Sequence, residues 1–109
     1  MRLRLESVGQ VVATRLIIDD ETQDVAFILK IGLPQKFPET ADYYCPVQIN
    51  PTSGHDGKVS HSVGVDAVQA LQLGLLLASG ILHRLNQQRG GKLRWTGGEN
   101  GGLGLPTPE

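Results

Sequence analysis

The chain contains few cysteine and aromatic residues, on which many sites in small domains depend. Its 109 residues include one cysteine, one tryptophan and one methionine, and aromatic residues make up 5%. A single cysteine excludes an intramolecular disulfide and every cysteine-rich metal framework. Ten basic and eleven acidic residues leave a net charge of -1, which excludes a strongly basic nucleic-acid domain and an acidic tail protein. The 39% apolar content is too high for a disordered chain.

Long hydrophobic runs are also missing. The longest apolar stretch, residues 70–82, is interrupted by Gln72, Ser79 and two glycines, and it falls short of the roughly 20 residues that a membrane span needs. The first six residues alternate charge with leucine and open no apolar region of the kind a signal peptide contains. We therefore expect a soluble, cytoplasmic protein with no membrane association.

The length fits one domain. We assign residues 1–96 to a single α+β domain. Residues 97–109 hold five glycines and two prolines and are typical of a loop or a loosely ordered tail.

The first half of the chain predicts strands. Residues 11–18 and 25–31 are rich in β-formers and flank the acidic turn 19–24, which is the pattern of a hairpin. Residues 33–41 contain two prolines and are expected to form a loop. Residues 42–49 and 58–63 predict two further strands around a turn. Pro46 donates no ladder hydrogen bond, so the strand that contains it should be an edge or carry a bulge.

A helix start follows at Asp66. The Asp66 carboxylate should cap the first turn, and Gln69 should reach back to the Asp66 N–H. The helix should extend from Ala67 to about Gln88 and end at Gly90 and Gly91. A helical wheel gives a wide apolar arc that would cover the sheet: Ala67, Val68, Ala70, Leu71, Leu75, Leu77, Ala78, Ile81, Leu82 and Leu85.

Residues 92–96 predict a short last strand. The sum is an antiparallel meander of about four strands packed against one long helix (about 67–88), with a possible short C-terminal strand, which is an α+β fold.

Two segments resemble a known family. They are Tyr44-Cys45-Pro46 in the context DYYCPVQI at residues 42–49, and the helix start GVDAVQALQL at residues 64–73. Together they resemble a family of small bacterial proteins known only as a domain of unknown function. Trp95 and the ending Gly104-Leu105-Pro106 are similar to later motifs of that family. The resemblance implies a bacterial, cytoplasmic, single-domain protein and transfers no catalytic residue.

Candidate catalytic and metal-binding residues are few. Cys45 with His61 or His83 as base, beside Tyr43 or Tyr44, would be the site of a small enzyme or small-ligand binder in a sheet–helix pocket. A buried structural thiol is the better interpretation of a mid-strand cysteine. His55, Asp56 and His61 match no zinc spacing. We therefore expect no catalytic, cofactor or metal site.

Charge is segregated along the chain. No acidic residue lies between positions 67 and 98, whereas Arg84, Arg89, Lys92 and Arg94 contribute +4 beside Trp95. Such a segment would suit a weak nucleic-acid binder or an acidic partner. Helix-end capping and solubility explain it more simply, and nucleic acid is not expected as the main ligand.

The first-ranked hypothesis is a non-enzymatic protein-interaction or regulatory module, such as an adaptor or an immunity-type partner of another protein. The small enzyme or ligand binder ranks second, and the nucleic-acid binder third. On the helical wheel Leu76 lies on the polar side, among Gln69, Gln72, His83 and Gln87, and Leu73 and Gly80 lie near it. This placement predicts a homodimer that buries Leu73 and Leu76.

Overall fold

The computed structural model describes residues 5–95 and 103–106. Within these residues the chain forms six strands and one helix. In sequence order they are β1 (Val11–Asp19), β2 (Val25–Gly32), β3 (Gln35–Lys36), β4 (Tyr43–Pro51), β5 (Ser60–Gly64), α1 (Ala67–Gln88) and β6 (Leu93–Trp95). The predicted α+β architecture is confirmed, and the predicted helix bounds coincide with those of α1.

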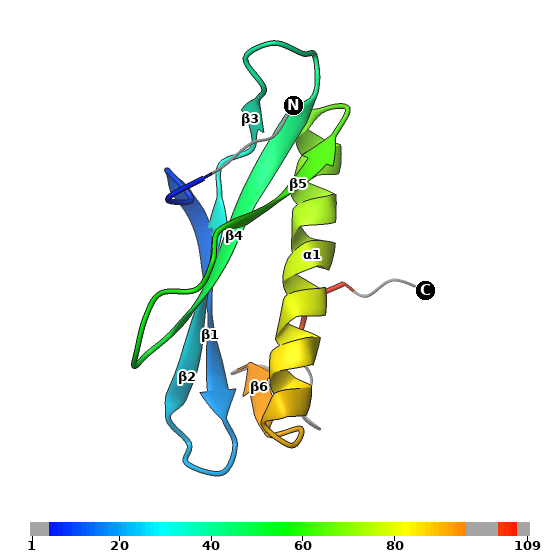
Figure 1. Ribbon diagram of the computed structural model, residues 1–109. Helices are drawn as coiled ribbons and strands as arrows, with labels where there is room; N and C mark the ends of the chain where they lie inside the picture. Colours follow the sequence, from blue (N-terminus) through cyan, green and yellow to red (C-terminus); the bar gives the residue numbers. More distant parts are fainter. Residues whose placement is uncertain (1–4, 96–102, 107–109) are drawn as a thin grey trace.

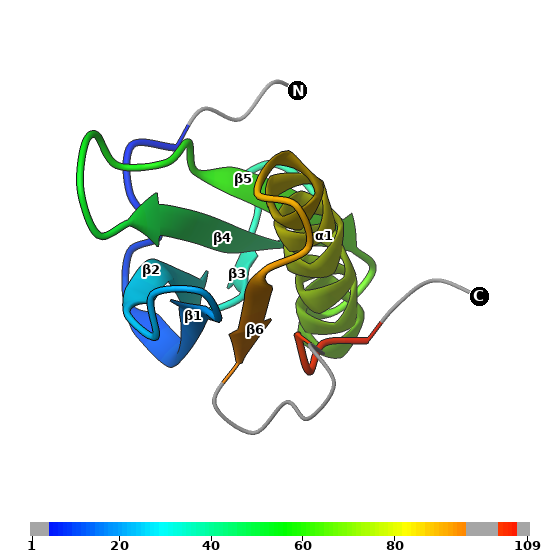
Figure 2. The ribbon, with the colours of Figure 1, turned by 90° about the horizontal axis from the view of Figure 1, so that it is seen from below.

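All six strands belong to one antiparallel sheet with α1 against one face (Figure 1). β1 pairs with β2, β2 with β4, and β4 with β5, as a meander requires. β6 pairs with the other side of β1. Helix α1 thus connects β5, at one edge of the sheet, to β6, at the opposite edge (Figure 2).

Period-two alternation sets the two faces of the sheet. Phe27, Leu29 and Ile31 of β2 lie beside Cys45, Val47 and Ile49 of β4 on the face that α1 covers, and all six are buried in the core. Period-two alternation of apolar residues in the sequence of residues 25–31 and 42–49 predicts these core faces, and the structure confirms them. β1 adds Ile17, and β6 adds Leu93; both are fully buried.

Ala70, Ala78 and Leu82 of the predicted arc are buried, and Gly74, which the arc did not include, lies between the two alanines. Ala70, Gly74 and Ala78, spaced four apart, are buried, and a Cβ on Gly74 would lie only 2.9 Å from the Cys45 Sγ atom. Leu82 continues this row and is fully buried, whereas the other leucines of the arc are half-buried. Val68, placed in the arc, is 65% exposed. The close helix–sheet approach at Gly74 leaves no room for a larger side chain at that position.

Two local expectations were wrong. Residues 33–41 are not entirely loop, because β3 pairs with Tyr43 and Tyr44. β4 is not an edge strand: it lies between β5 on one side and β2 with β3 on the other. Pro46 is tolerated there because it lies where the partner of β4 changes from β2 to β3, so the missing N–H breaks no continuous ladder.

Part of the expected C-terminal tail packs on the domain. Leu103 is 6% exposed and belongs to the core, and Leu105 packs against it. The segment 103–106 lies beside α1 on the side of β6 (Figures 1 and 2). The remaining tail positions, 97–102 and 107–109, and Thr96 of the predicted last strand lie outside the described residues.

Helix α1 is long and apolar enough to cross a membrane by length and composition, with a mean hydropathy of 1.3 over an 18-residue window. Residues 70–82, which alone are too short to span a membrane, are therefore part of a longer apolar helix. In this fold the helix packs on the sheet, but only 28% of that window is buried.

Candidate functional site

The outer side of α1 carries apolar residues that the core does not use. Leu73 is 38% exposed, and Leu76 is half-buried without packing against the buried core. A Cβ on Gly80 would meet no atom within 4 Å. These three residues lie three and four positions apart, so they are neighbours on one helix side. We call them the outer patch; its place is the one predicted for Leu73 and Leu76.

The start of α1 is fixed by its cap. The Asp66 carboxylate accepts a 2.8 Å hydrogen bond from the Gln69 N–H, as predicted. The Gln69 side chain, however, accepts from the N–H of Val65 at 2.8 Å and not from that of Asp66. The extended backbone at Asp66 places the Val65 N–H within reach of the amide oxygen. Both residues therefore have structural roles.

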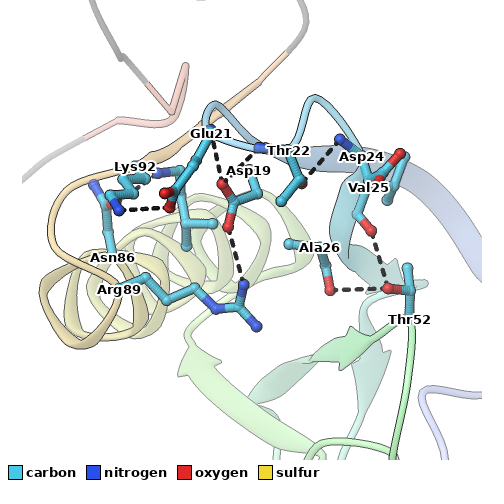
Figure 3. Close-up of polar contacts among 11 residues, drawn as sticks. Asp19, Glu21, Thr22, Asp24, Val25, Ala26, Thr52, Asn86, Arg89 and Lys92 are labelled. Carbon is cyan, nitrogen blue, oxygen red and sulfur yellow. Dashed lines mark hydrogen bonds and ion pairs between the residues drawn. The ribbon is translucent and has the colours of Figure 1, made fainter.

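The end of α1 is tied to the acidic turn between β1 and β2 (Figure 3). Arg89 contacts Asp19 at 3.2 Å, Lys92 contacts Glu21 at 2.5 Å and Arg94 contacts Asp20 at 2.7 Å. The charges that are segregated along the sequence thus meet in space, because β6 lies beside β1. Three of the four basic residues of this segment are therefore paired with acids, and only Arg84 has no ion pair within the described residues.

These contacts shift the titration of the groups involved. The N–H groups of Glu21 and Thr22, and then Arg89, lower the pKa of Asp19. Arg94, and then Gln23, lower the pKa of Asp20, and Glu21 raises the pKa of Lys92. In addition, the Asn86 side chain accepts a 2.8 Å hydrogen bond from the Leu93 N–H. These ion pairs and hydrogen bonds therefore join the end of α1 and β6 to the β1–β2 turn.

Trp95 has a structural partner as well. The Arg15 guanidinium lies 4.2 Å from the centre of the Trp95 ring and donates to the carbonyl oxygens of Leu103 and Gly104 at 3.3 and 2.8 Å. Gly104 adopts a φ of 72°, and a Cβ there would lie 2.6 Å from the ring, so glycine is required at that position. These contacts of Arg15 were not predicted from the sequence. A lone arginine on the core-facing side of β1 was a possible signal for them.

Cys45 does not form a catalytic pair with His61. Its side chain is fully buried, and burial raises the pKa of its thiol to about 11, so the nucleophilic thiolate is suppressed at neutral pH. His61 pairs in register with Pro46, whereas Cys45 pairs with Ser62. Cys45 and His61 therefore point to opposite faces of the sheet. The Cys45 Sγ instead donates to the Gly32 carbonyl oxygen at 3.5 Å.

A groove of about 460 Å³ lies on the face of the sheet opposite α1, between residues 5–9 and β3–β4. The space between sheet and helix, where a ligand pocket was expected, is filled by the core. Tyr44, which lines the groove, donates to the Gln35 side chain at 3.5 Å, and its ring packs against Phe37 and His61. Glu6 is the one charged side chain among the described lining residues.

Within residues 5–95 and 103–106, no three His, Cys, Asp or Glu side chains converge on a point where they could hold a metal ion. In the same part of the chain, every buried side-chain nitrogen and oxygen has a hydrogen-bond partner. The most prominent feature without a structural role is thus the outer patch.

Comparison with known proteins gives one match. The family model described as "Domain of unknown function (DUF6968)" matches residues 13–107. No curated protein and no solved structure matches the chain significantly.

Proposed function

Because the chain belongs to the DUF6968 family of domains of unknown function, we propose its function from the geometry: it is a protein-interaction module that binds through the outer patch of α1. The observation that carries the proposal is the mismatch between the apolarity of α1 and its burial. Only 28% of its most apolar window is buried. Leu73 and Leu76 are neighbours on the side of α1 that faces away from the sheet, and apolar neighbours left without a core contact suit an interaction site.

The partner that best suits the outer patch is a second copy of the chain. Cyclic two-fold dimers are the commonest closed assemblies of soluble proteins. A two-fold axis places the same residues opposite one another. The neighbours at the first end of the patch, Gln69 and Gln72, are uncharged, and Arg84, four residues after Gly80, is the charged neighbour at its other end. Gly80 presents bare backbone there, so the two helices can approach closely.

The structural roles of the other candidates support this ranking. Three cations of the basic segment are paired with acids, and Cys45 is enclosed and protonated at neutral pH. The outer patch has no comparable internal use.

The test is light scattering on the wild-type protein and on Leu76→Glu, with Gln87→Glu as the matched control. Gln87 is exposed and lies on the same side of α1, so its substitution adds the same charge outside the patch. We expect a dimer for the wild type and for Gln87→Glu, and a folded monomer for Leu76→Glu. A wild-type monomer that floats with anionic lipid vesicles would contradict the proposal and assign the patch to a membrane surface.

A further inference from the structure

The groove on the sheet face opposite α1 has a closely packed wall. Val8 belongs to the segment 5–9 that forms this wall, and it is buried. It lies over Gly32 of β2 and Pro46 of β4: a Cβ on Gly32 would collide with the Val8 carbonyl oxygen and lie 2.6 Å from the Pro46 Cγ atom. Gly9 follows with a φ of 69°, a conformation that favours glycine. The segment is therefore seated on the sheet by its own packing, and the groove beside it is a defined feature of the fold.

The polar side chains of the groove offer mainly acceptor oxygens. The Glu6 carboxylate can only accept hydrogen bonds. The Tyr44 hydroxyl donates its proton to the Gln35 side chain at 3.5 Å, which leaves the lone pairs of its own oxygen for a ligand. The donor end of Gln35 lies against Gly9, since a Cβ there would be 3.6 Å from the Gln35 Nε2 atom. A ligand that meets Glu6 and Tyr44 must therefore bring donors.

Apolar groups complete the lining. They are the side chains of Leu5, Val8 and Pro46. The Tyr44 ring is held beside them by Phe37, with the two ring centres 4.9 Å apart. The volume of about 460 Å³ falls within the roughly 300–1,000 Å³ of small-molecule sites, which combine an apolar lining with a few polar groups.

We propose that this groove binds a small organic amine in its protonated form, with the ammonium group at Glu6 and Tyr44 and an apolar body against the leucine, valine and proline of the lining. The three donors of an ammonium group match the acceptor oxygens, and a cation is also attracted to the face of a tyrosine ring. The negative charge of Glu6 disfavours an anion. Because the groove lies on the sheet face away from α1, this binding is independent of the proposed self-association.

The test is a titration of the full-length wild-type protein, followed by the NMR shifts of its backbone amides. The probe is 2-phenylethylamine, whose ammonium group, like that of lysine, is protonated at neutral pH. Two compounds with a similar carbon frame serve as controls: 2-phenylethanol, which is neutral, and phenylacetate, which is an anion. We expect saturable shifts at residues 6–9, Gln35 and Tyr44, with a dissociation constant on the order of 1 mM for a ligand of so few atoms. The amine should bind about threefold more tightly than the alcohol, and phenylacetate more weakly than both.

A variant pair assigns the preference for the cation to the groove. Glu6→Gln removes the charge and keeps the shape of the side chain, whereas Glu39→Gln makes the same change at an exposed acid outside the lining. An exposed ion pair accounts for a few-fold change in affinity. We therefore expect Glu6→Gln to raise the dissociation constant of the amine about threefold, to that of the alcohol, and to leave the alcohol unaffected. Glu39→Gln should change neither by more than about 1.5-fold.

Three results would overturn the inference. Shifts that do not saturate, or that saturate only at residues outside the groove, would show that the groove is not a binding site. Phenylacetate binding as tightly as the amine would refute the proposed class of ligand. An amine affinity that Glu6→Gln lowers no more than Glu39→Gln does would remove Glu6 from the site. None of these results bears on the outer patch, so the proposed function would stand or fall separately.

Discussion

Two glycines in the middle of α1 allow a matched test of how the helix sits on the sheet. Alanine is favoured over glycine in a helix interior by about 1 kcal/mol, and this gain applies to both sites. At Gly80 a Cβ meets nothing within 4 Å, so Gly80→Ala should stabilise the fold by about that amount. At Gly74 it would lie 2.9 Å from Cys45 Sγ and 3.2 Å from Cys45 Cβ.

Such overpacking of a tight core costs about 1–3 kcal/mol. We expect a net destabilisation of about 1–2 kcal/mol for Gly74→Ala. Because the propensity gain is common to both variants, the difference between them isolates the packing cost. Urea unfolding followed by the fluorescence of Trp95, the single tryptophan, measures both, at the lowest practical concentration so that association contributes least.

The double variant Gly74→Ala/Cys45→Ala identifies the cause. If the clash with Sγ is responsible, removal of the sulfur should restore part of the loss, and the two substitutions will not be additive. If Gly74→Ala were as stabilising as Gly80→Ala, α1 would not be seated on β4 at Cys45, and the helix–sheet contact described above would be wrong.

Three further predictions concern the cap, the thiol and the acidic turn. Asp66→Ala should lower the free energy of unfolding by about 1 kcal/mol in urea without loss of self-association; an unchanged midpoint with lost association would make Asp66 a binding residue. Cys45 should resist Ellman's reagent at neutral pH until denaturant is added, because it is buried and its pKa is raised to about 11; rapid labelling of the native protein would contradict its placement. Asp19 and Asp20 have lowered pKa values, so their contribution is present above the ordinary value of 3.8 and is lost as the pH falls through the lowered values. In acid titration Asp20→Asn should therefore show a flatter loss of stability below pH 3.8 than the wild type, and an equal slope would mean that the Arg94 contact does not stabilise the fold.

The sequence predicted those features that depend on local patterns. The cap at Asp66 and the glycines at positions 90 and 91 bound α1 at both ends, and both glycines adopt positive φ values. Alternation along β2 and β4 identified the core face. β3 was missed because a two-residue strand between prolines has no period to detect.

Features that depend on tertiary placement were beyond such patterns. The pairing of Arg89, Lys92 and Arg94 with the acidic turn requires that β6 lie beside β1, some 70 residues away in sequence. The helical wheel identified the side of α1 that is buried, but its arc did not include Gly74, whose missing side chain lets the helix approach Cys45. A wheel gives direction but not the distance between helix and sheet, and here that distance is set by small residues on both sides.

The central claim is that the exposed side of α1 joins two copies of the chain. Sedimentation equilibrium over an about hundredfold range of concentration tests it most directly, since the population of a dimer depends on concentration by mass action. The account predicts a mass that rises from that of the 11.7 kDa chain to twice that value for the wild type, and no rise for Leu76→Glu. A wild-type mass equal to one chain at every concentration would contradict it.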